Sequence, residues 1–247
     1  MKMYENKYDD PVFFEKYGQM SRSQQGLEGA GEWNTLQSLL PDFAGKRVLD
    51  LGCGYGWHCI HAAQQGALRV VGVDLSEKML EMAREKTVFP QVTYLRAPIE
   101  EISFAKDSFD IVLSSLALHY VASFEEVVLR VRNCLTAGGW FVFSVEHPVF
   151  TAQGTQDWHY GTNGEILHYP VDNYFYEGKR QAVFLGEPVV KYHKTLTTYL
   201  NGLLTNGFEI VNVVEPQPPV HLMHLEGMKE EMRRPMMLIV KARKKED

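Results

Sequence analysis

Short apolar runs alternate with amphipathic segments through the middle of the chain. The apolar runs cover residues 48–51, 68–73, 92–95, 110–114 and 140–145. Segments with helical periodicity separate them at 57–65, 77–86 and 124–134. Ser76 and Ser123 stand where helix N-caps are expected. Repeated strand–helix units of this kind predict a parallel sheet with helices on both of its faces.

The first 44 residues carry a different pattern and are predicted to form a helical cap. Phe13, Phe14 and Tyr17 have the spacing of a short amphipathic helix, and residues 21–26 are polar enough for a loop. A second helix is predicted over residues 31–40, with its apolar side chains on one face. Pro and Gly then interrupt the chain before the first strand.

Residues 146–194 interrupt the alternation again. This segment is rich in aromatic residues and contains three short strand-like runs, at 173–176, 180–185 and 189–193, separated by turn residues. We expect an antiparallel meander inserted after the fifth strand. A helix at 195–206, a strand at 208–214, a helix near 221–233 and a strand at 236–242 follow. No linker or repeat is visible, so residues 1–247 are predicted to form one domain.

Composition and charge limit the classes of function. The longest uncharged apolar stretch, residues 111–122, is too short to cross a bilayer, and the first ten residues lack the apolar segment of a signal peptide. A net charge of -6 argues against a nucleic-acid-binding surface. Three cysteines without a CxxC pair indicate reduced thiols, as in a cytoplasmic protein. The oligomeric state is left open.

The first apolar run ends in a glycine-rich turn. Residues 48–56 read Val-Leu-Asp-Leu-Gly-Cys-Gly-Tyr-Gly, and a helical segment follows. Glycine is needed where the backbone takes a positive φ or where a ligand lies against bare main chain. We therefore expect a buried parallel strand that ends in a tight turn beside a ligand.

Four motifs in this order, at residues 48–56, 70–76, 108–114 and 135–141, resemble those of the class I S-adenosylmethionine-dependent methyltransferases. The resemblance implies a Rossmann-like α/β fold with a seven-stranded, mostly parallel sheet whose last strand is reversed. It also implies that S-adenosylmethionine is the cofactor and lies across the carboxyl ends of strands one to four. In open α/β sheets, ligands bind at this edge where the strand order reverses.

The same resemblance assigns parts of the cofactor to individual residues. Gly52 and Gly54 let the chain approach the methionine part, Asp50 orients its ammonium group, and Asp74 accepts both ribose hydroxyls. Pro98 stands where the family often has an acidic residue beside adenine, which leaves the backbone of Ile99 to contact the ring. The predicted cofactor-binding residues are Tyr17, Arg22, Asp50, Gly52, Cys53, Gly54, Asp74, Leu75, Met79, Pro98, Ile99 and Ser114.

The methyl acceptor is expected to be a small molecule. Residues 114–120 contain neither the Asn-Pro-Pro-Tyr motif of amino-group methylation on adenine or glutamine nor a nucleophilic cysteine for cytosine. His119 and His147 each follow the carboxyl end of a central strand and are candidates for a general base or for holding a substrate carboxylate. Packing beneath the inserted segment is the alternative role for both. The candidate substrate-binding residues are Trp158, Asp172, Tyr174 and His193.

Two other functions compete with this one. Asp74 also has the spacing of a dinucleotide fingerprint, but Trp57 occupies the position of its third glycine and obstructs a pyrophosphate. A nicotinamide-dependent oxidoreductase is therefore less favoured. A regulator that binds the cofactor without turnover is the second alternative. His58, Cys59 and His61 do not share one helix face, so no metal site is predicted.

Overall fold

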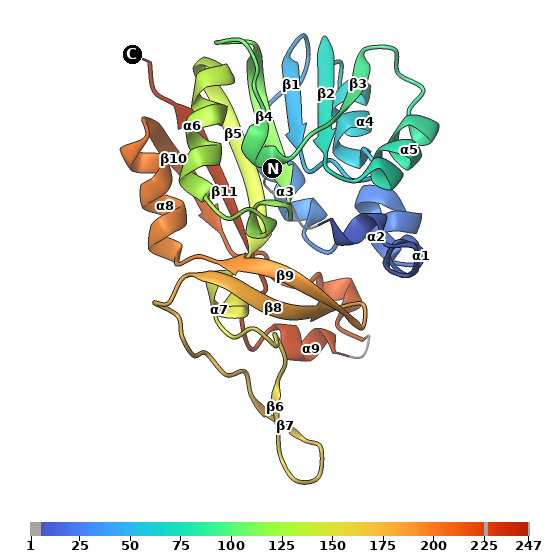
Figure 1. The fold of residues 1–247 in the computed structure, drawn as a ribbon, viewed down its shortest axis with the longest axis vertical. Helices are drawn as coiled ribbons and strands as arrows, with labels where there is room; N and C mark the ends of the chain where they lie inside the picture. The colour runs from blue at the N-terminus through green and yellow to red at the C-terminus, as the bar shows by residue number, and fades with distance from the viewer. Residues whose placement is uncertain (1–5, 225–226, 247) are drawn as a thin grey trace.

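The structure is a computed structural model that describes residues 6–224 and 227–246. A seven-stranded sheet with the order β10-β11-β5-β4-β1-β2-β3 organises the chain (Figure 1). The strands are β1 (Arg47–Leu51), β2 (Arg69–Asp74), β3 (Val92–Arg96), β4 (Phe109–Ser115), β5 (Leu135–Glu146), β10 (Phe208–Val214) and β11 (Met237–Lys244). β11 runs antiparallel to both of its neighbours, β5 and β10, and the remaining pairings in this sheet are parallel. This confirms the Rossmann-like sheet with a reversed last strand.

Helices cover both faces of the sheet because successive strand residues point to opposite sides. On one face, Leu49 and Leu51 belong to the same buried cluster as residues of α6 (Phe124–Cys134) and α8 (Leu196–Thr205). On the other face, Val48 packs with residues of α3 (Trp33–Leu39), α4 (Trp57–Gln64) and α5 (Glu77–Lys86). The side chains of Ser76, Ser123 and Thr195 cap α5, α6 and α8.

The fifth strand begins earlier than the sequence indicates. Gly138 and Gly139 lie within β5 and do not end the preceding element. The pairing of β5 with β4 skips from Leu135 to Trp140, so these glycines form an irregularity in the register. The predicted run at 140–145 is therefore only the second part of this strand.

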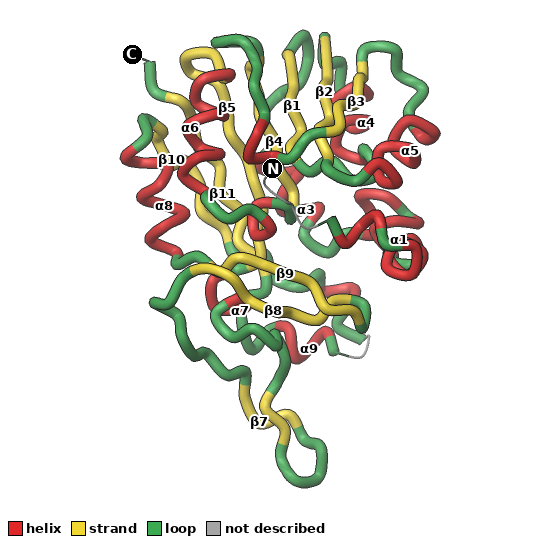
Figure 2. Tube along the Cα trace, viewed as in Figure 1, coloured by secondary structure: helices red, strands yellow, loops and turns green. Residues whose placement is uncertain are grey.

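The inserted segment forms two hairpins and not a three-stranded meander. Helix α7 (Pro148–Thr151) is followed by the hairpin of β6 (His159–Tyr160) and β7 (Ile166–His168), and then by the hairpin of β8 (Gly178–Phe184) and β9 (Glu187–His193). Figure 2 shows β8 and β9 crossing below the sheet, with β7 farther away. Residues 173–176 form a turn, because Asn173 has a φ of 57° and its carbonyl accepts from the N–H of Tyr176.

The N-terminal segment packs partly against the sheet and partly against the second hairpin. It contains η1 (Lys7–Asp9), α1 (Pro11–Gly18), α2 (Ser21–Gln24) and η2 (Gly26–Gly29) before α3. The predicted polar loop at 21–26 is thus largely helical. Phe13 of α1 is fully buried against Ala182 of β8 and Val189 of β9. The cap and the inserted segment therefore share a small hydrophobic core.

Two shorter 3-10 turns, η3 (Ile99–Glu101) and η4 (Leu118–Tyr120), follow β3 and β4. The helix predicted near 221–233 is present only as η5 (Val220–Leu222) and α9 (Met228–Glu231), and residues 225–226 of that prediction lie outside the described residues. None of the helices in the described ranges has the length and apolar character needed to cross a membrane.

Candidate active site

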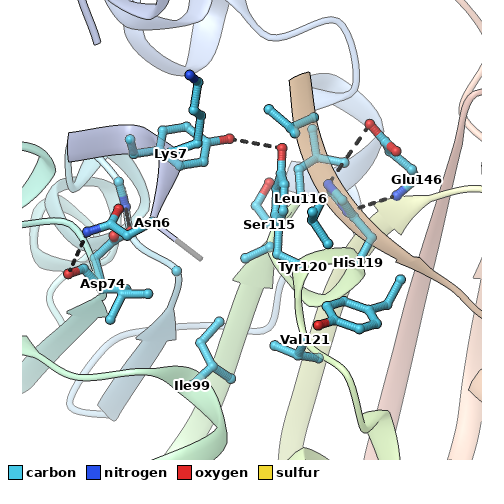
Figure 3. Close-up of a pocket in the computed structure, with 18 of the residues that line it drawn as sticks. Asn6, Lys7, Asp74, Ile99, Ser115, Leu116, His119, Tyr120, Val121 and Glu146 are labelled. Carbon is cyan, nitrogen blue, oxygen red and sulfur yellow. Dashed lines mark hydrogen bonds and ion pairs between the residues drawn. The ribbon is translucent and has the colours of Figure 1, made fainter. Parts of the chain in front are cut away.

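A cavity of about 520 Å³ opens at the carboxyl ends of β1, β2, β4 and β5. Its volume lies within the range of small-ligand sites, roughly 300–1,000 Å³. Figure 3 shows Asp74 and Ile99 on one side of it and His119, Tyr120 and Glu146 on the other. The predicted residues that line the cavity are Tyr17, Arg22, Gly52, Gly54, Asp74, Leu75, Met79, Pro98, Ile99 and His119.

The glycine turn exposes its backbone to the cavity. Gly52 and Gly54 have φ values of 74° and 51°, in the region that favours glycine. A Cβ on Gly52 would collide with the Cβ of Ala117, whereas one on Gly54 would meet no described atom within 4 Å. The backbone N–H of Gly52 donates to the carbonyl of Val73 at 2.8 Å, which ties the turn to β2. The turn is thus fixed in position while its surface stays open to a ligand.

Asp74 is fixed by two backbone donors. Its Oδ2 accepts from the N–H of Gly54 at 2.8 Å, and its Oδ1 accepts from the N–H of Ser76 at 2.9 Å. Burial raises the pKa of this carboxyl, although the two hydrogen bonds oppose that effect. Each carboxylate oxygen can accept two hydrogen bonds, so each retains a lone pair for a ligand hydroxyl. The apolar side chains of Leu75 and Met79 line the cavity beside it.

Three of the predicted cofactor-binding residues lie beneath the strand ends and do not line the cavity. Asp50 is only 1% exposed, accepts a hydrogen bond from the Cys59 thiol at 3.4 Å, and has its pKa raised to about 7 by burial. Its other oxygen is buried and has no hydrogen-bond partner among the described residues. Cys53 is buried, and Ser114 donates to the carbonyl of Leu51 at 2.8 Å.

Tyr17 and Arg22 reach the cavity from the N-terminal segment. Nη2 of Arg22 donates to both carboxylate oxygens of Glu32, at 2.8 and 2.9 Å. Burial acts against the charge of Arg22, but the Glu32 carboxylate raises the pKa of the guanidinium. Tyr17 packs edge-to-face against the ring of Tyr55. The arginine is therefore charged and held in place at the edge of the cavity.

His119 is buried at the opposite end of the cavity from Asp74. Its Nδ1 accepts from the backbone N–H of Glu146 at 3.3 Å, which places the proton of the neutral ring on Nε2. Burial lowers the pKa of His119 to about 4, so the ring is neutral near pH 7. The hydroxyl of the next residue, Tyr120, accepts from the hydroxyl of Tyr8 at 3.1 Å.

Glu146 is the main polar residue of this end that sequence reasoning missed. Its Oε1 accepts from Lys191 Nζ at 2.5 Å, and its Oε2 accepts from Gln156 at 2.7 Å. Burial favours the neutral acid, but the facing imidazole of His119, the charge of Lys191 and these hydrogen bonds lower the pKa of Glu146. In the sequence, Glu146 is marked as a candidate site residue only by its place at the end of an apolar strand. The sequence does not reveal partners 10 and 45 residues away.

The other missed lining residues come from segments without a motif. They are supplied by the first residues of the described chain, by the turn after β4, by α6, by the second hairpin and by β11. Those that line the cavity include Asn6, Lys7, Tyr8, Met20, Glu100, Ser115, Leu116, Ala117, Tyr120, Val121, Ser123, Glu126, Phe184, Val189, Val190, Tyr192, Met236 and Met237.

His147 does not line the cavity. Its Nδ1 accepts from the N–H of Val149 at 3.0 Å and so caps the short helix α7. Its Nε2 lies 2.9 Å from Oε1 of Glu215. Burial lowers the pKa of the ring, and the Glu215 carboxylate opposes this. His147 therefore lies next to the candidate site but does not line it.

The four predicted substrate residues also lie outside the cavity lining. His193 is fully buried between the Thr151 hydroxyl and the carbonyl of Tyr174, each at 2.8 Å. The Tyr174 hydroxyl accepts from the N–H of Leu196. Trp158 packs against Tyr169 and Arg234, and Asp172 is exposed and accepts from the N–H of Asn173. These side chains support the inserted segment internally or face solvent.

No group of three or more His, Cys, Asp or Glu side chains within the described ranges is arranged to hold a metal ion. His58 and His61 instead pack with their rings against Trp33. Cys59 points toward Asp50, on a different side of α4.

Comparison with known proteins supports the fold. Residues 49–143 match a family described as a methyltransferase domain. A crystal structure from Listeria monocytogenes, assigned to the S-adenosylmethionine-dependent methyltransferases, is 55% identical, with a TM-score of 0.86 over 90% of this chain and 100% of that one. An S-adenosylmethionine-dependent methyltransferase from Mesorhizobium loti is 43% identical, with a TM-score of 0.82 over 89% and 100% of the two chains. An uncharacterized protein from Haemophilus influenzae is 34% identical over 97% of both chains.

Proposed function

The chain belongs to the class I S-adenosylmethionine-dependent methyltransferases, and on that premise we propose that its acceptor is a small molecule held at the His119 end of the cavity. The proposal rests on two segments, η1 and β9, that cover the site and are called its roof. Lys7 and Tyr8 of η1 and Val189, Val190 and Tyr192 of β9 line the cavity opposite the strand ends. A site of this volume that is covered by two segments suits a small molecule better than a segment of a folded macromolecule.

The roof is built from two segments that hold each other. Lys16 Nζ lies 2.8 Å and Lys7 Nζ 3.4 Å from the carboxylate of Glu187 at the start of β9. Asp9 extends the contact to the start of α5, because it accepts from the hydroxyl of Ser76 at 2.5 Å and from the N–H of Lys78 at 3.2 Å. The inserted segment therefore stands where it would determine which acceptor enters.

S-adenosylmethionine is the cofactor of this family, and the residues at the Asp74 end fit it. The free lone pairs of Asp74 suit the ribose hydroxyls, and the open backbone at Gly54 admits the methionine part. Arg22 would offer its charge to the cofactor's carboxylate, and the unpaired oxygen of Asp50, buried behind the turn, would orient the ammonium group. When bound, the cofactor supplies a methyl group on an electrophilic sulfonium.

The chain's own contribution to the reaction is orientation and exclusion of water. Holding two reactants in line contributes on the order of 7–11 kcal/mol to the acceleration. Family membership favours this chemistry over a nicotinamide-dependent oxidation. It also makes the chain an enzyme, so a regulator without turnover is not required to explain the site.

Two measurements test the proposal. Calorimetry should show binding of S-adenosylmethionine and no binding of NAD. The low-molecular-weight fraction of a cell extract should then stimulate release of S-adenosylhomocysteine, whereas the protein and RNA retained by ultrafiltration should not. Release that depends only on the retained macromolecules would contradict the small-molecule proposal while leaving the family assignment intact.

A further inference from the structure

Glu146 and His119 present complementary atoms to the acceptor end of the cavity. Both residues line it, and Oε1 of Glu146 lies 3.9 Å from Nε2 of His119, too far for a hydrogen bond (Figure 3). We propose that these two atoms recognise the reacting group of the acceptor, and that this group is an uncharged hydroxyl or amine on an aromatic or apolar body. The inference deepens the proposed function and rests on it.

Glu146 and His119 lie far enough from Asp74 to leave room for a second ligand beside the cofactor. Asp74 ends β2 and Glu146 ends β5, and β1 and β4 stand between these strands in the sheet. Neighbouring strands are about 4.8 Å apart, so the two carboxylates are separated by roughly 14 Å along the sheet edge. The glycine turn that follows β1 occupies the space between them.

Glu146 is held as a charged acceptor from behind. Lys191 bonds Oε1 of Glu146 and also donates to Oε1 of Gln156 at 2.8 Å, while the amide nitrogen of Gln156 donates to Oε2 of Glu146. Lys191 is 3% exposed and does not line the cavity. Each oxygen of the carboxylate therefore has one partner on the protein side and one lone pair left for the cavity. The orientation of the carboxylate is fixed before any ligand arrives.

His119 supplies the opposite polarity. Because its Nδ1 is occupied by the backbone N–H of Glu146, its proton is on Nε2, which is a donor. A ligand atom that contacts both residues must donate a hydrogen to Glu146 and accept one from His119. A hydroxyl or a neutral amine does both at once.

Charged groups satisfy only half of this arrangement. A carboxylate or phosphate oxygen has no hydrogen to donate and is repelled by Glu146. An ammonium group has no lone pair and leaves the N–H of His119 unpaired. Leaving one buried polar group unsatisfied weakens binding by roughly 5- to 150-fold. The pair therefore selects against both ionic classes.

The walls around the pair indicate the body of the acceptor. The aromatic side chains of Tyr8, Tyr120, Phe184 and Tyr192 line the cavity together with Val190. Tyr8 and Tyr120 pack edge-to-face with ring centroids 5.9 Å apart. Such surroundings favour a flat or apolar molecule over a sugar or a peptide.

The experiment compares two probes with the same 4-ethylphenyl body, 4-ethylphenol and 4-ethylbenzoate, on the full chain saturated with S-adenosylhomocysteine. Ligand-observed NMR titrations should give wild-type protein a preference of tenfold or more for the phenol. Glu146→Gln removes the repelling charge and should bring the preference close to one. Equal preference in wild type and variant, tighter binding of the benzoate to wild type, or no binding of either probe would overturn the inference.

Controls separate recognition from damage to the fold. Glu209→Gln, an exposed glutamate on β10, should keep the wild-type preference. Because Glu146→Gln leaves Lys191 buried without its carboxylate, the double variant Glu146→Gln/Lys191→Met removes both charges and should show the same loss of preference. S-adenosylmethionine affinity is measured in parallel. If wild type fails to bind the cofactor, the proposed function fails, whereas normal cofactor binding with an unchanged probe preference contradicts this inference alone.

Discussion

The two ends of the cavity are built in different ways. At the cofactor end, backbone groups of Gly54 and Ser76 fix one carboxylate, Asp74, across at most 20 residues of sequence. At the acceptor end, side chains from distant segments meet, since Tyr8 bonds Tyr120 across 112 residues and Lys191 bonds Glu146 across 45. The first end depends on local backbone geometry and the second on tertiary packing.

This contrast separates what the whole family needs from what one member needs. A glycine turn and a strand-end carboxylate serve any protein that holds the same cofactor. The acceptor end uses Tyr8 of η1 and the second hairpin, which lie outside the sheet, where folds vary most readily. Substitutions at the cofactor end should therefore change cofactor affinity. Substitutions at the acceptor end should change turnover or the choice of acceptor.

The largest expected effect is at the cofactor end. Asp74→Ala should weaken S-adenosylmethionine binding by roughly 2–4 kcal/mol, because two hydrogen bonds to a charged group are lost and water replaces part of them. Calorimetry measures the affinity, and circular dichroism checks that the sheet is retained. Asp74→Asn, which keeps one oxygen acceptor, should fall between wild type and the alanine variant. Normal affinity in the alanine variant would remove Asp74 from the cofactor site.

The acceptor end should respond to acid through His119. The unfolded ring has a pKa near 6.5, and burial lowers the folded value to about 4. Between these values only the unfolded chain binds the proton, so stability falls as the pH drops from about 6.5 to 4, by roughly 3 kcal/mol in total. Urea unfolding across this range should show a shallower decline in His119→Gln than in wild type. Parallel curves would mean that the ring is not buried neutral.

Two substitutions of His119 distinguish a hydrogen-bond donor from a general base. Glutamine places its amide nitrogen near the position of Nε2, whereas asparagine matches Nδ1 and loses the donor toward the acceptor. We expect His119→Asn to slow turnover by roughly tenfold, about the value of one hydrogen bond, and His119→Gln to stay closer to wild type. The measurement is S-adenosylhomocysteine release with an identified acceptor. Losses of roughly 10²–10⁴-fold in both variants would indicate a base instead.

The contrast between the two ends also explains how far the sequence could predict the molecule. The strand–helix alternation and the four motifs predict the sheet, its reversed strand and the residues around Gly52, Gly54 and Asp74, because each signal lies within a few consecutive residues. The aromatic residues at 173–176 favour a strand, but in the structure Phe175 and Tyr176 are exposed and Asn173 turns the chain.

The residues that line the acceptor end are harder to identify from the sequence, because they lie far apart along the chain. His119 and His147 look equivalent in the sequence, since each follows an apolar strand. In the structure, η4 turns His119 into the cavity, whereas His147 caps α7 and faces Glu215. Lys191 and Gln156 distinguish Glu146 from an ordinary strand-end acid, and their proximity to it depends on how the inserted segment folds back.

His147 provides the matched comparison to His119. His147→Ala should cost about 1 kcal/mol of stability, because the N-cap of α7 is lost, and should leave S-adenosylmethionine affinity and turnover unchanged. His147→Asn restores a good N-cap and should recover most of the loss. Thermal unfolding together with turnover tests both statements. Slower turnover in the asparagine variant, at normal stability, would give His147 a role in the reaction.

The smallest expected effect is at Asp172, which tests whether the whole inserted segment or only its second hairpin belongs to the acceptor end. Asp172 is exposed and lies outside the cavity lining, and the N–H of Asn173 donates to it at 2.7 Å. Asp172→Ala should change stability by less than about 0.5 kcal/mol, as for other surface positions, and should leave cofactor affinity and turnover unchanged. Turnover is compared with that of Tyr192→Ala, because Tyr192 lines the cavity on β9 and should be sensitive. If Asp172→Ala alone slows the reaction, the first part of the inserted segment must reach the acceptor during turnover. The acceptor end would then include more of the inserted segment than its second hairpin.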